Sequence, residues 1–239
     1  MGFRRLAGLR LARAGALGAA LAATVCLPAQ QPAVFQVDFT HAEQFPAHWR
    51  LKVNPDGSGQ FDSDGGAIPT DQAAQIVAGE LHRPVQLSPQ LAGQIFSTAR
   101  QRKLFRMGCE SHLKVAFQGT KRFSYSGPEG SGACEFNYSK DKEIQSLSDS
   151  LIAVETTLLY GARLDKMLVH DRLGLDREME GLVSAVQDGN AIELGTIRDT
   201  LTRIAEDEQV LDRDRRKARK LLAQASPDVA GSSRPTGSQ

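Results

Sequence analysis

Short segments in which apolar and polar residues alternate run through the first half of the chain. The alternation covers residues 34–39 and 48–53, and Asp56-Gly57 separates the second segment from QFDSDGG at 60–66. Alternation with a period of two is typical of strands with one buried face, and Asp-Gly between two such segments is typical of a hairpin turn. We therefore expect antiparallel strands here, and QIVAGEL at 75–81 is predicted to be a further strand.

A helix is predicted to begin after Ser88. Serine is a favoured N-cap residue, and Pro89 suits the first helical position. The apolar residues that follow recur at helical spacing and share one face: Leu91, Ile95, Phe96 and Ala99. The basic run RQRK at 100–103 suits a helix C-terminus, and Gly108 is predicted to be the C-cap. We interpret the run as a solvated helix end, with a binding patch as the alternative.

The segment from Cys109 to Tyr138 is predicted to form the centre of the sheet. Its pattern indicates a strand at 113–117, a tight turn at Gly119-Thr120, a return strand through Phe123 and Tyr125, a flexible loop at 128–132 and a third strand from Cys134. Its aromatic residues are expected in the core, with a ligand-stacking surface as the alternative.

From Lys140 onward the apolar residues recur at helical spacing. The pattern predicts a long amphipathic helix from about 141 to 169, a helix at 175–186 that ends at Asp188-Gly189-Asn190, and another at 194–204. The last two are expected to pair antiparallel as a hairpin. The segment EDEQVLDRDRRKARKLL is expected to continue or follow the helix at 194–204. Its Arg215–Lys220 cluster is expected to be solvated, with binding of an acidic partner or of lipid headgroups as the alternative. The predicted fold class is therefore α+β.

The N-terminus has the three parts of a secretory signal peptide. Four arginines precede an apolar run at 14–27, which is short for a membrane span, and Pro28-Ala29 follows it. We expect cleavage near Ala29 or Gln30 and export to the periplasm or the extracellular space. The alternatives are an uncleaved anchor, a lipoprotein modified at Cys26 and, from Arg4-Arg5, a twin-arginine route.

Four regions follow from these patterns. They are a signal peptide at 1–30, a disulfide-linked sheet region at 33–140, a helical region at 141–225 and a disordered tail at 226–239. Loss of the four leader arginines lowers the net charge from +1 to about −3. A mildly acidic chain of this kind is not expected to bind nucleic acid, and no later segment is long and apolar enough to span a membrane.

Two cysteines remain after the leader, Cys109 and Cys134. An even pair in an oxidising compartment predicts a disulfide, and closing a loop of about 26 residues contributes roughly 3–4 kcal/mol in the chain-entropy model. A metal or nucleophile site built from Cys109 and His112 is the alternative, although no second metal-ligand pair supports it.

No catalytic, cofactor-binding or metal-binding residue is predicted, because none of the common catalytic or nucleotide-binding motifs is present. A calcium loop near Asn54 and Asp56 has the wrong residues at two ligand positions, so we interpret it as a turn. The five histidines, listed below, show no ligand spacing on a helix, and the acid pairs Asp62/Asp64 and Glu178/Glu180 are expected to be solvated. The histidines are His41, His48, His82, His112 and His170.

The sequence therefore favours a non-catalytic, exported module that binds a protein or another envelope component of unknown identity. Two alternatives remain open. One is a secreted hydrolase or metal enzyme with a site outside the known motifs, for which His112 and Asp64 are the residues to test. The other is a binding domain similar in layout to secreted protease inhibitors, although no inhibitor motif matches residue by residue.

Overall fold

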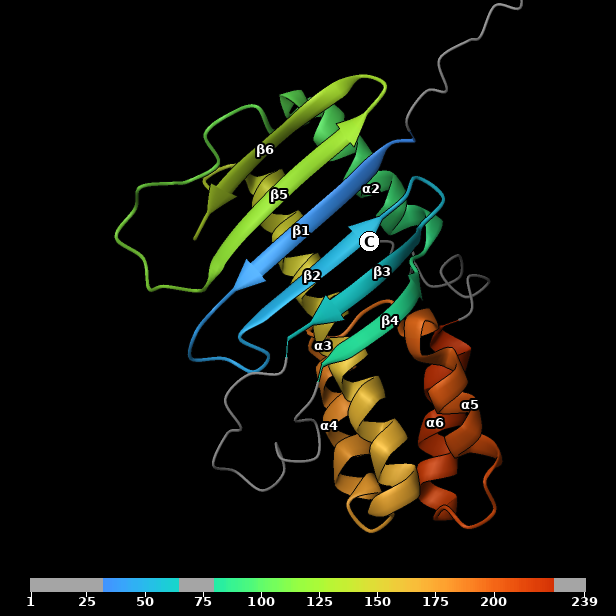
Figure 1. Cartoon of the computed structure of the whole chain (residues 1–239). Coiled ribbons are helices and arrows are strands. Elements are labelled where there is room, and N and C mark those ends of the chain that lie inside the picture. The colour runs from blue at the N-terminus through green and yellow to red at the C-terminus, as the bar shows by residue number, and fades with distance from the viewer. Residues whose placement is uncertain (1–31, 65–79, 226–239) are drawn as a thin grey trace, which may run out of the picture. The chain divides into compact units, whose positions relative to one another are not determined.

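The computed structural model describes residues 32–64 and 80–225, and these confirm the predicted α+β class (Figure 1). The strands are β1 (Val34–Thr40), β2 (His48–Val53), β3 (Ser58–Ser63), β4 (Leu81–Gln86), β5 (Thr120–Gly127) and β6 (Gly130–Phe136). The helices are α2 (Pro89–Gln101), α3 (Lys142–His170), α4 (Leu175–Gln187), α5 (Arg198–Glu206) and α6 (Asp212–Gln224), with short 3-10 turns η1 (Lys103–Phe105) and η2 (Leu194–Ile197).

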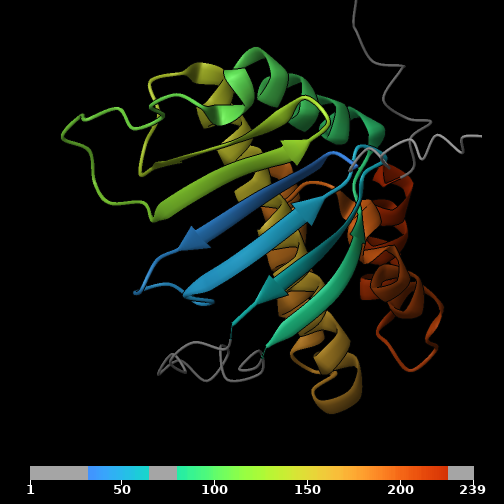
Figure 2. The ribbon, with the colours of Figure 1, turned by 45° about the horizontal axis from the view of Figure 1, so that its top comes forward.

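The six strands form one antiparallel sheet in the order β4-β3-β2-β1-β5-β6. Helices α2 and α3 cover one face of this sheet, as Figure 2 shows. The other face, here called the open face, is covered by no helix among the described residues. The strand alternation read from the sequence explains this division, because successive side chains of a strand point to opposite faces.

The buried face is rich in aromatic residues. Phe35, Val37 and Phe39 of β1 are at most 4 % exposed. Trp49 of β2 stacks on Phe39, with 5.3 Å between the ring centroids. These rings pack against the apolar face of α2 and the first half of α3 in a single core. Burial of this face is the main force that fixes the strand register, since a slip of one residue would expose it.

Helix α2 begins as the sequence predicts. The Ser88 hydroxyl accepts a hydrogen bond from the Leu91 N–H, and Pro89 occupies the first turn. The Glu193 carboxylate also accepts from the Ser88 N–H and hydroxyl, both at 2.6 Å. A carboxylate is stabilised at a helix N-terminus, so this contact ties the start of α2 to the segment before η2.

Helix α3 belongs to two apolar cores. Its N-terminal part, including Leu151 and Leu158, packs in the sheet core, and its C-terminal part, including Leu164 and Met167, packs with the C-terminal helices. Gly161 lies between the two, where an added Cβ would collide with the Ile197 side chain. The close approach of α3 and η2 therefore requires a residue without a side chain at this position.

The predicted strand at 113–117 is wrong. Residues 111–119 have no regular secondary structure, and β5 begins directly after Gly119, so Gly119-Thr120 is no hairpin turn. The tight turn lies at Pro128-Glu129, within the segment predicted to be a flexible loop, and it joins β5 to β6.

The predicted end of α2 is also wrong. The C-cap of this helix is Arg102 rather than Gly108, and the next three residues, η1, all have positive φ. This left-handed turn carries Phe105 into the sheet core, where it is fully buried. Arg102 is not simply solvated, because its guanidinium pairs with Asp141 at 2.5 Å and with Glu143 at 3.1 Å.

Two further elements differ from the prediction. Strand β4 spans Leu81–Gln86, whereas the sequence pattern predicted a strand that ended at Leu81. Strand β4 lies at the edge of the sheet, where its Pro84 is tolerated. The predicted hairpin of the helices at 175–186 and 194–204 is also replaced by another pairing. Helix α5 pairs with α6, whereas α4 packs against α3 and α6.

Several predictions lie wholly or mostly outside the described residues. These are the signal peptide at 1–30, the disordered tail at 226–239 and most of the strand at 75–81. The division between a sheet region at 33–140 and a helical region at 141–225 stays a prediction.

Candidate functional site

A loop between η1 and β5 exposes three large apolar side chains. Residues 111–118, here called the apolar loop, project beyond the sheet at the left of Figure 1. Leu113 is 49 % exposed, Val115 39 % and Phe117 59 %. Single exposed apolar residues are common, whereas several close together on one loop make it a candidate binding surface.

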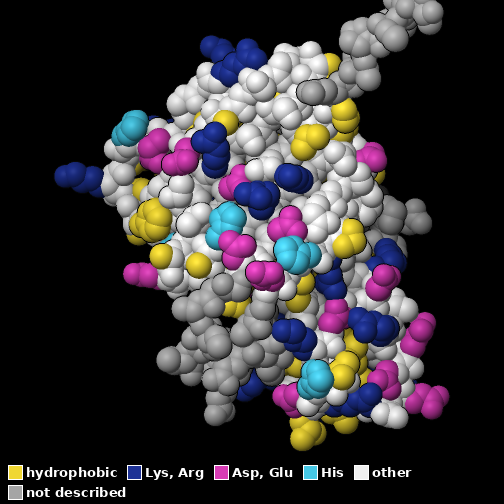
Figure 3. Space-filling view, in the orientation of Figure 1, with side chains coloured by type: hydrophobic (Ala, Val, Ile, Leu, Met, Phe, Trp, Pro, Cys, Tyr) yellow, Lys and Arg dark blue, Asp and Glu magenta, His cyan; other side chains and the backbone are white. Residues whose placement is uncertain are grey.

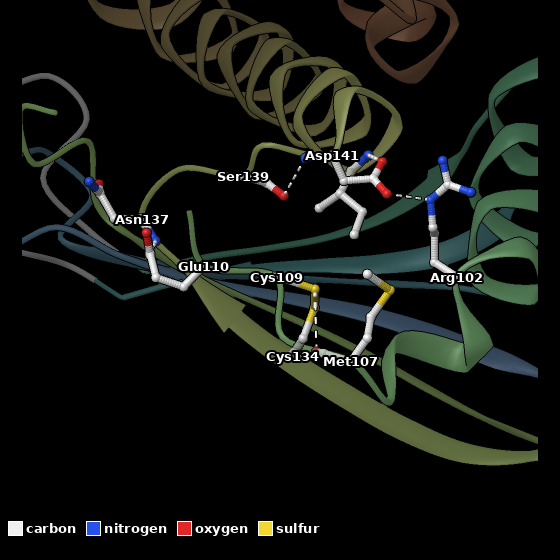
Figure 4. The surroundings of a disulfide bond; sticks show 9 residues. Arg102, Met107, Cys109, Glu110, Cys134, Asn137, Ser139 and Asp141 are labelled. Carbon is white, nitrogen blue, oxygen red and sulfur yellow. Dashed lines mark hydrogen bonds and ion pairs between the residues drawn. A yellow bond between two sulfur atoms is a disulfide. The ribbon is translucent and has the colours of Figure 1, made fainter. Parts of the chain in front are cut away.

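The base of the apolar loop is covalently fixed. Cys109 and Cys134, which the sequence analysis paired, form a buried disulfide with 5.8 Å between their Cα atoms. The bond joins the chain just before the loop to the buried face of β6. Figure 4 shows Glu110 and Asn137 side by side beyond this disulfide.

Glu110 holds the first residues of the apolar loop. Its carboxylate accepts hydrogen bonds from the Asn137 N–H at 2.6 Å, and from the His112 N–H and the Ser111 hydroxyl at 3.1 Å each. The Asn137 N–H holds the pKa of Glu110 down to about 2, and the His112 N–H adds to this effect. The carboxylate is therefore ionised at any physiological pH and acts as a fixed acceptor.

Asn137 holds the far end of the loop. Its side-chain NH2 donates to the Ala116 carbonyl at 3.2 Å, and its side-chain oxygen accepts from the Gln118 N–H at 2.6 Å. The Ser111 N–H donates to the Tyr138 carbonyl at 2.9 Å. Both ends of the loop are thus fixed to the residues that follow β6, while Leu113 and Val115 stay partly exposed.

The histidines do not converge on one site. His112 lies in the apolar loop, and the ring of His41 contacts Phe117 with 5.2 Å between centroids. His48 and His82 lie on the open face, and His170 ends α3. His112 is also not a partner of Cys109 in a metal or nucleophile site, because that sulfur is in the disulfide.

The acidic residues singled out by the sequence have protein partners. The Asp62 carboxylate pairs with His82 at 2.8 Å, and Asp64 pairs with His48 at 2.8 Å. The hydrogen bond from His82 holds the pKa of Asp62 below its usual value, and the same bond raises the pKa of His82.

The Asp56 carboxylate accepts hydrogen bonds from the Ser58 N–H and hydroxyl within the β2–β3 turn. No cluster of three potential metal ligands occurs in residues 32–64 and 80–225.

Part of the charged C-terminal segment is taken up by ion pairs with a neighbouring helix. Lys217 reaches Asp176 at 2.8 Å, Asp214 at 3.2 Å and Glu180 at 3.4 Å. Glu178 pairs with Arg163. These contacts leave less charge for an acidic partner than the Arg215–Lys220 run alone suggests.

Sequence reasoning missed three residues that support the loop. They are Glu110, Asn137 and Lys121, whose ammonium donates to the Asn137 carbonyl at 2.6 Å. Their positions in the sequence, rather than their residue types, could have indicated this role. Glu110 directly follows Cys109, and Asn137 lies three residues after Cys134. Lys121 is in phase with the buried residues Phe123 and Tyr125 of β5. The exposed apolar residues were recognised as a pattern but assigned to a strand.

No protein-family model matches the chain, and no curated protein sequence matches it significantly. Within the part of the chain that the structure describes, no helix has the length and apolar character needed to cross a membrane.

Proposed function

We propose that this chain is an exported, non-catalytic protein-binding module, and that the apolar loop is its binding element. The observation that carries the proposal is the exposure of Leu113, Val115 and Phe117 on a loop whose two ends are fixed. A loop held in place loses little conformational entropy on binding, so its apolar surface contributes more fully to affinity. Aromatic anchors such as Phe117 commonly dominate such interfaces.

Export is part of this proposal. The leader pattern at 1–30 and the disulfide between Cys109 and Cys134 both favour an oxidising destination. Intact mass spectrometry of protein from its native host tests it. We expect a mature chain that begins near Ala29 or Gln30 and has no thiol that reacts with an alkylating agent. A retained leader together with two reactive thiols in the mature region contradicts the proposal.

Comparative capture from the envelope and extracellular fractions of the native host tests the binding role. The baits are the wild type, the loop variant Leu113→Ser/Phe117→Ser and a control variant, Val169→Ser/Leu173→Ser. The control removes two other exposed apolar side chains, which lie 70 % and 90 % exposed at the end of α3 and in the turn after it. We expect one protein to be retained by the wild type and the control but lost from the loop variant. If all three baits retain the same protein equally well, the apolar loop is not the binding element.

Inhibition of a protease is a second candidate function. Asn137 favours it, because its side chain bonds the backbone of Ala116 and Gln118 while Leu113 and Val115 remain partly exposed. A loop held in this way resembles a substrate that cannot relax after cleavage. Residual-activity assays with serine, cysteine and metalloproteases test this idea. Inhibition that depends on Leu113 supports it, whereas rapid cleavage of the oxidised loop contradicts it.

A further inference from the structure

The strand register aligns one ionisable residue from each strand in a single row across the open face. Cross-strand pairing is direct at every step from β6 to β4. In that order the row, here called the charged row, consists of Glu135, Arg122, Asp38, Arg50, Asp62 and His82. Negative and positive positions alternate along it when His82 is protonated. Figure 3 shows the resulting diagonal band of magenta, dark blue and cyan side chains.

Neighbours in the charged row pair with each other at several steps. Arg50 contacts Asp38 at 2.6 Å, and His82 contacts Asp62 at 2.8 Å. At the other end, Arg122 and Glu135 are 3.9 Å apart, and their side chains are 55 % and 58 % exposed. Opposite charges that face each other on adjacent strands also stabilise the sheet of a single chain. The two ends of the row nevertheless remain largely in solvent.

The charged row has an even number of positions with alternating sign. When a second copy of the row is laid on it in the opposite direction, every charge therefore meets a charge of the other sign. Turning a second copy about a two-fold axis that runs parallel to the strands, between β1 and β2, places each residue opposite one of the other sign. Asp38 then faces Arg50 of the second copy. By the same operation Arg122 faces Asp62, and Glu135 faces His82. An axis along the row would instead place like charges together.

We propose that two copies of this chain associate through their open faces, with the two charged rows facing each other in reverse order. The contact is isologous, as in every two-fold dimer, because each copy contributes the same patch. Six strands of about six residues present roughly 500 Å² per copy, or about 1,000 Å² in total, which is the range of weak, specific interfaces.

The composition of the face sets the strength expected of this dimer. Beside the charged row the open face carries small polar side chains, including Gln36, Ser124 and Gln60, and a shallow hollow of about 610 Å³ near Lys52. Little apolar area is buried, so electrostatic complementarity has to supply the specificity. We expect a dissociation constant on the order of 0.1 mM at low salt, and clear weakening at high salt.

The row also has a simpler role, which is to stabilise the sheet of a monomer. The two roles differ at the ends of the row. Glu135 and His82 are five strand spacings apart, roughly 24 Å, which is too far for a direct pair within one chain. Only a second copy facing the first brings them together.

Charge reversals at the two ends therefore distinguish the roles. The variants are Glu135→Arg and His82→Glu, studied by sedimentation velocity at low salt and about pH 6, where His82 beside Asp62 and Glu80 is protonated. Each variant alone is expected to weaken self-association about tenfold. An equimolar mixture of the two should associate as heterodimers, and the double variant should regain self-association. Far-UV circular dichroism checks that every variant is folded.

Three results would overturn the proposal. They are a wild type that stays monomeric at about millimolar concentration, single variants that associate as well as the wild type, and a mixture that shows no recovery. None of these substitutions touches the apolar loop, so the outcome is independent of the partner-binding experiment.

Discussion

Lys121 and Glu110 are charged residues that sit at the base of the apolar loop. The Lys121 side chain lies on the buried face of β5 with only 1 % of its surface exposed, and its ammonium donates to the Asn137 carbonyl at 2.6 Å. Burial lowers the pKa of Lys121. Glu110 and Lys121 thus hold the N–H and the carbonyl of the same residue, Asn137, which in turn holds the loop.

Replacing Glu110 should weaken the fold in a pH-dependent way. Glu110→Gln places an amide donor near backbone donors, and we expect a loss of about 2 kcal/mol at neutral pH. Because the folded pKa of about 2 lies below the ordinary 4.5, the stabilisation by the wild-type carboxylate is complete above 4.5 and is lost as pH falls toward 2. Urea unfolding of the wild type and of Glu110→Gln, repeated across this pH range, measures the difference in their free energies of unfolding.

Glu135→Gln is the matched control for that experiment, because this exposed carboxylate on β6 has only a distant partner. Glu135→Gln should change the free energy of unfolding by no more than about 0.5 kcal/mol. A Glu110→Gln effect that is the same at pH 7 and near pH 2 would contradict the assignment.

Asp214 and Asp176 are neighbouring carboxylates with opposite pKa shifts. Asp214 of α6 is fully buried, and burial raises its pKa, as does the adjacent Asp176. The hydrogen bond from Lys217 lowers the pKa of Asp176. Ionised Asp214 therefore costs stability as pH rises above 3.8, whereas ionised Asp176 contributes stability that is lost below 3.8.

The two asparagine substitutions should consequently differ in sign. Asp214→Asn is expected to be neutral or stabilising by about 1 kcal/mol at pH 7, and this benefit should vanish near pH 3. Asp176→Asn removes the acceptor of Lys217 and Arg213 and should cost about 1–2 kcal/mol at pH 7. Denaturant unfolding at both pH values measures the two effects. Destabilisation by Asp214→Asn at pH 7 would show that its contact with Lys217 outweighs burial.

At the scale of elements, the sequence predicted those whose burial follows a clean period. Strands β1 and β2 and helices α2 and α3 were found because residues such as Phe35 and Leu151 face a single core. Residues 113–117 have the same alternation, yet they form no strand, because Glu110 and Asn137 take up backbone groups at both ends of the segment. Periodicity reports a preference for a pleated surface, and local side-chain bonds override it here.

The misassigned elements have similarly specific causes. Strand β4 was not recognised because Pro84 interrupts it, and prolines are tolerated only at sheet edges. The left-handed turn at η1 was not predicted because it contains no glycine, the residue that usually marks a positive φ. An amphipathic stripe shows that a helix is buried on one side but not against which neighbour, so the pairing of α5 with α6 was not predictable from the stripes alone.

Glu193 offers a test at the scale of an element junction. Its backbone is left-handed, with φ 57°, and its carboxylate holds Ser88 at the start of α2. Glu193→Ala should cost about 2 kcal/mol. Glu193→Gly loses the same contacts but relieves the backbone by about 1 kcal/mol, so it should be less destabilising than the alanine variant. Chemical denaturation of both variants provides the comparison, and equal losses would argue against backbone strain at this residue.

At the scale of the whole molecule, α3 and polar contacts among the described residues join the sheet and α2 to the C-terminal helices. Helix α3 passes through both cores, Glu193 holds Ser88, and Asp165 of α3 pairs with Arg83 of β4 at 2.5 Å and with Arg203 of α5. An isolated surface pair contributes little, but a carboxylate shared by two arginines from different elements restrains both.

We therefore expect the described parts of the chain to unfold in one cooperative transition. Trp49, the single tryptophan of the chain, is buried in the sheet core and reports on the sheet by fluorescence, while far-UV circular dichroism reports mainly on the helices. The two denaturation curves should coincide, and Asp165→Ala should shift both together by about 1–2 kcal/mol. Loss of the helical signal before the fluorescence change would show two separate domains.

The borders of the sheet have a consequence for how the protein behaves when concentrated. On one side, Pro84 removes a hydrogen-bond donor from β4. On the other, the Arg106 guanidinium donates to the Ser131 carbonyl of β6, and the Leu104 carbonyl lies where a side chain at Gly132 would be. Both outer strands are therefore interrupted as templates for pairing with a neighbouring molecule, which disfavours edge-to-edge stacking of the folded chain into fibrils.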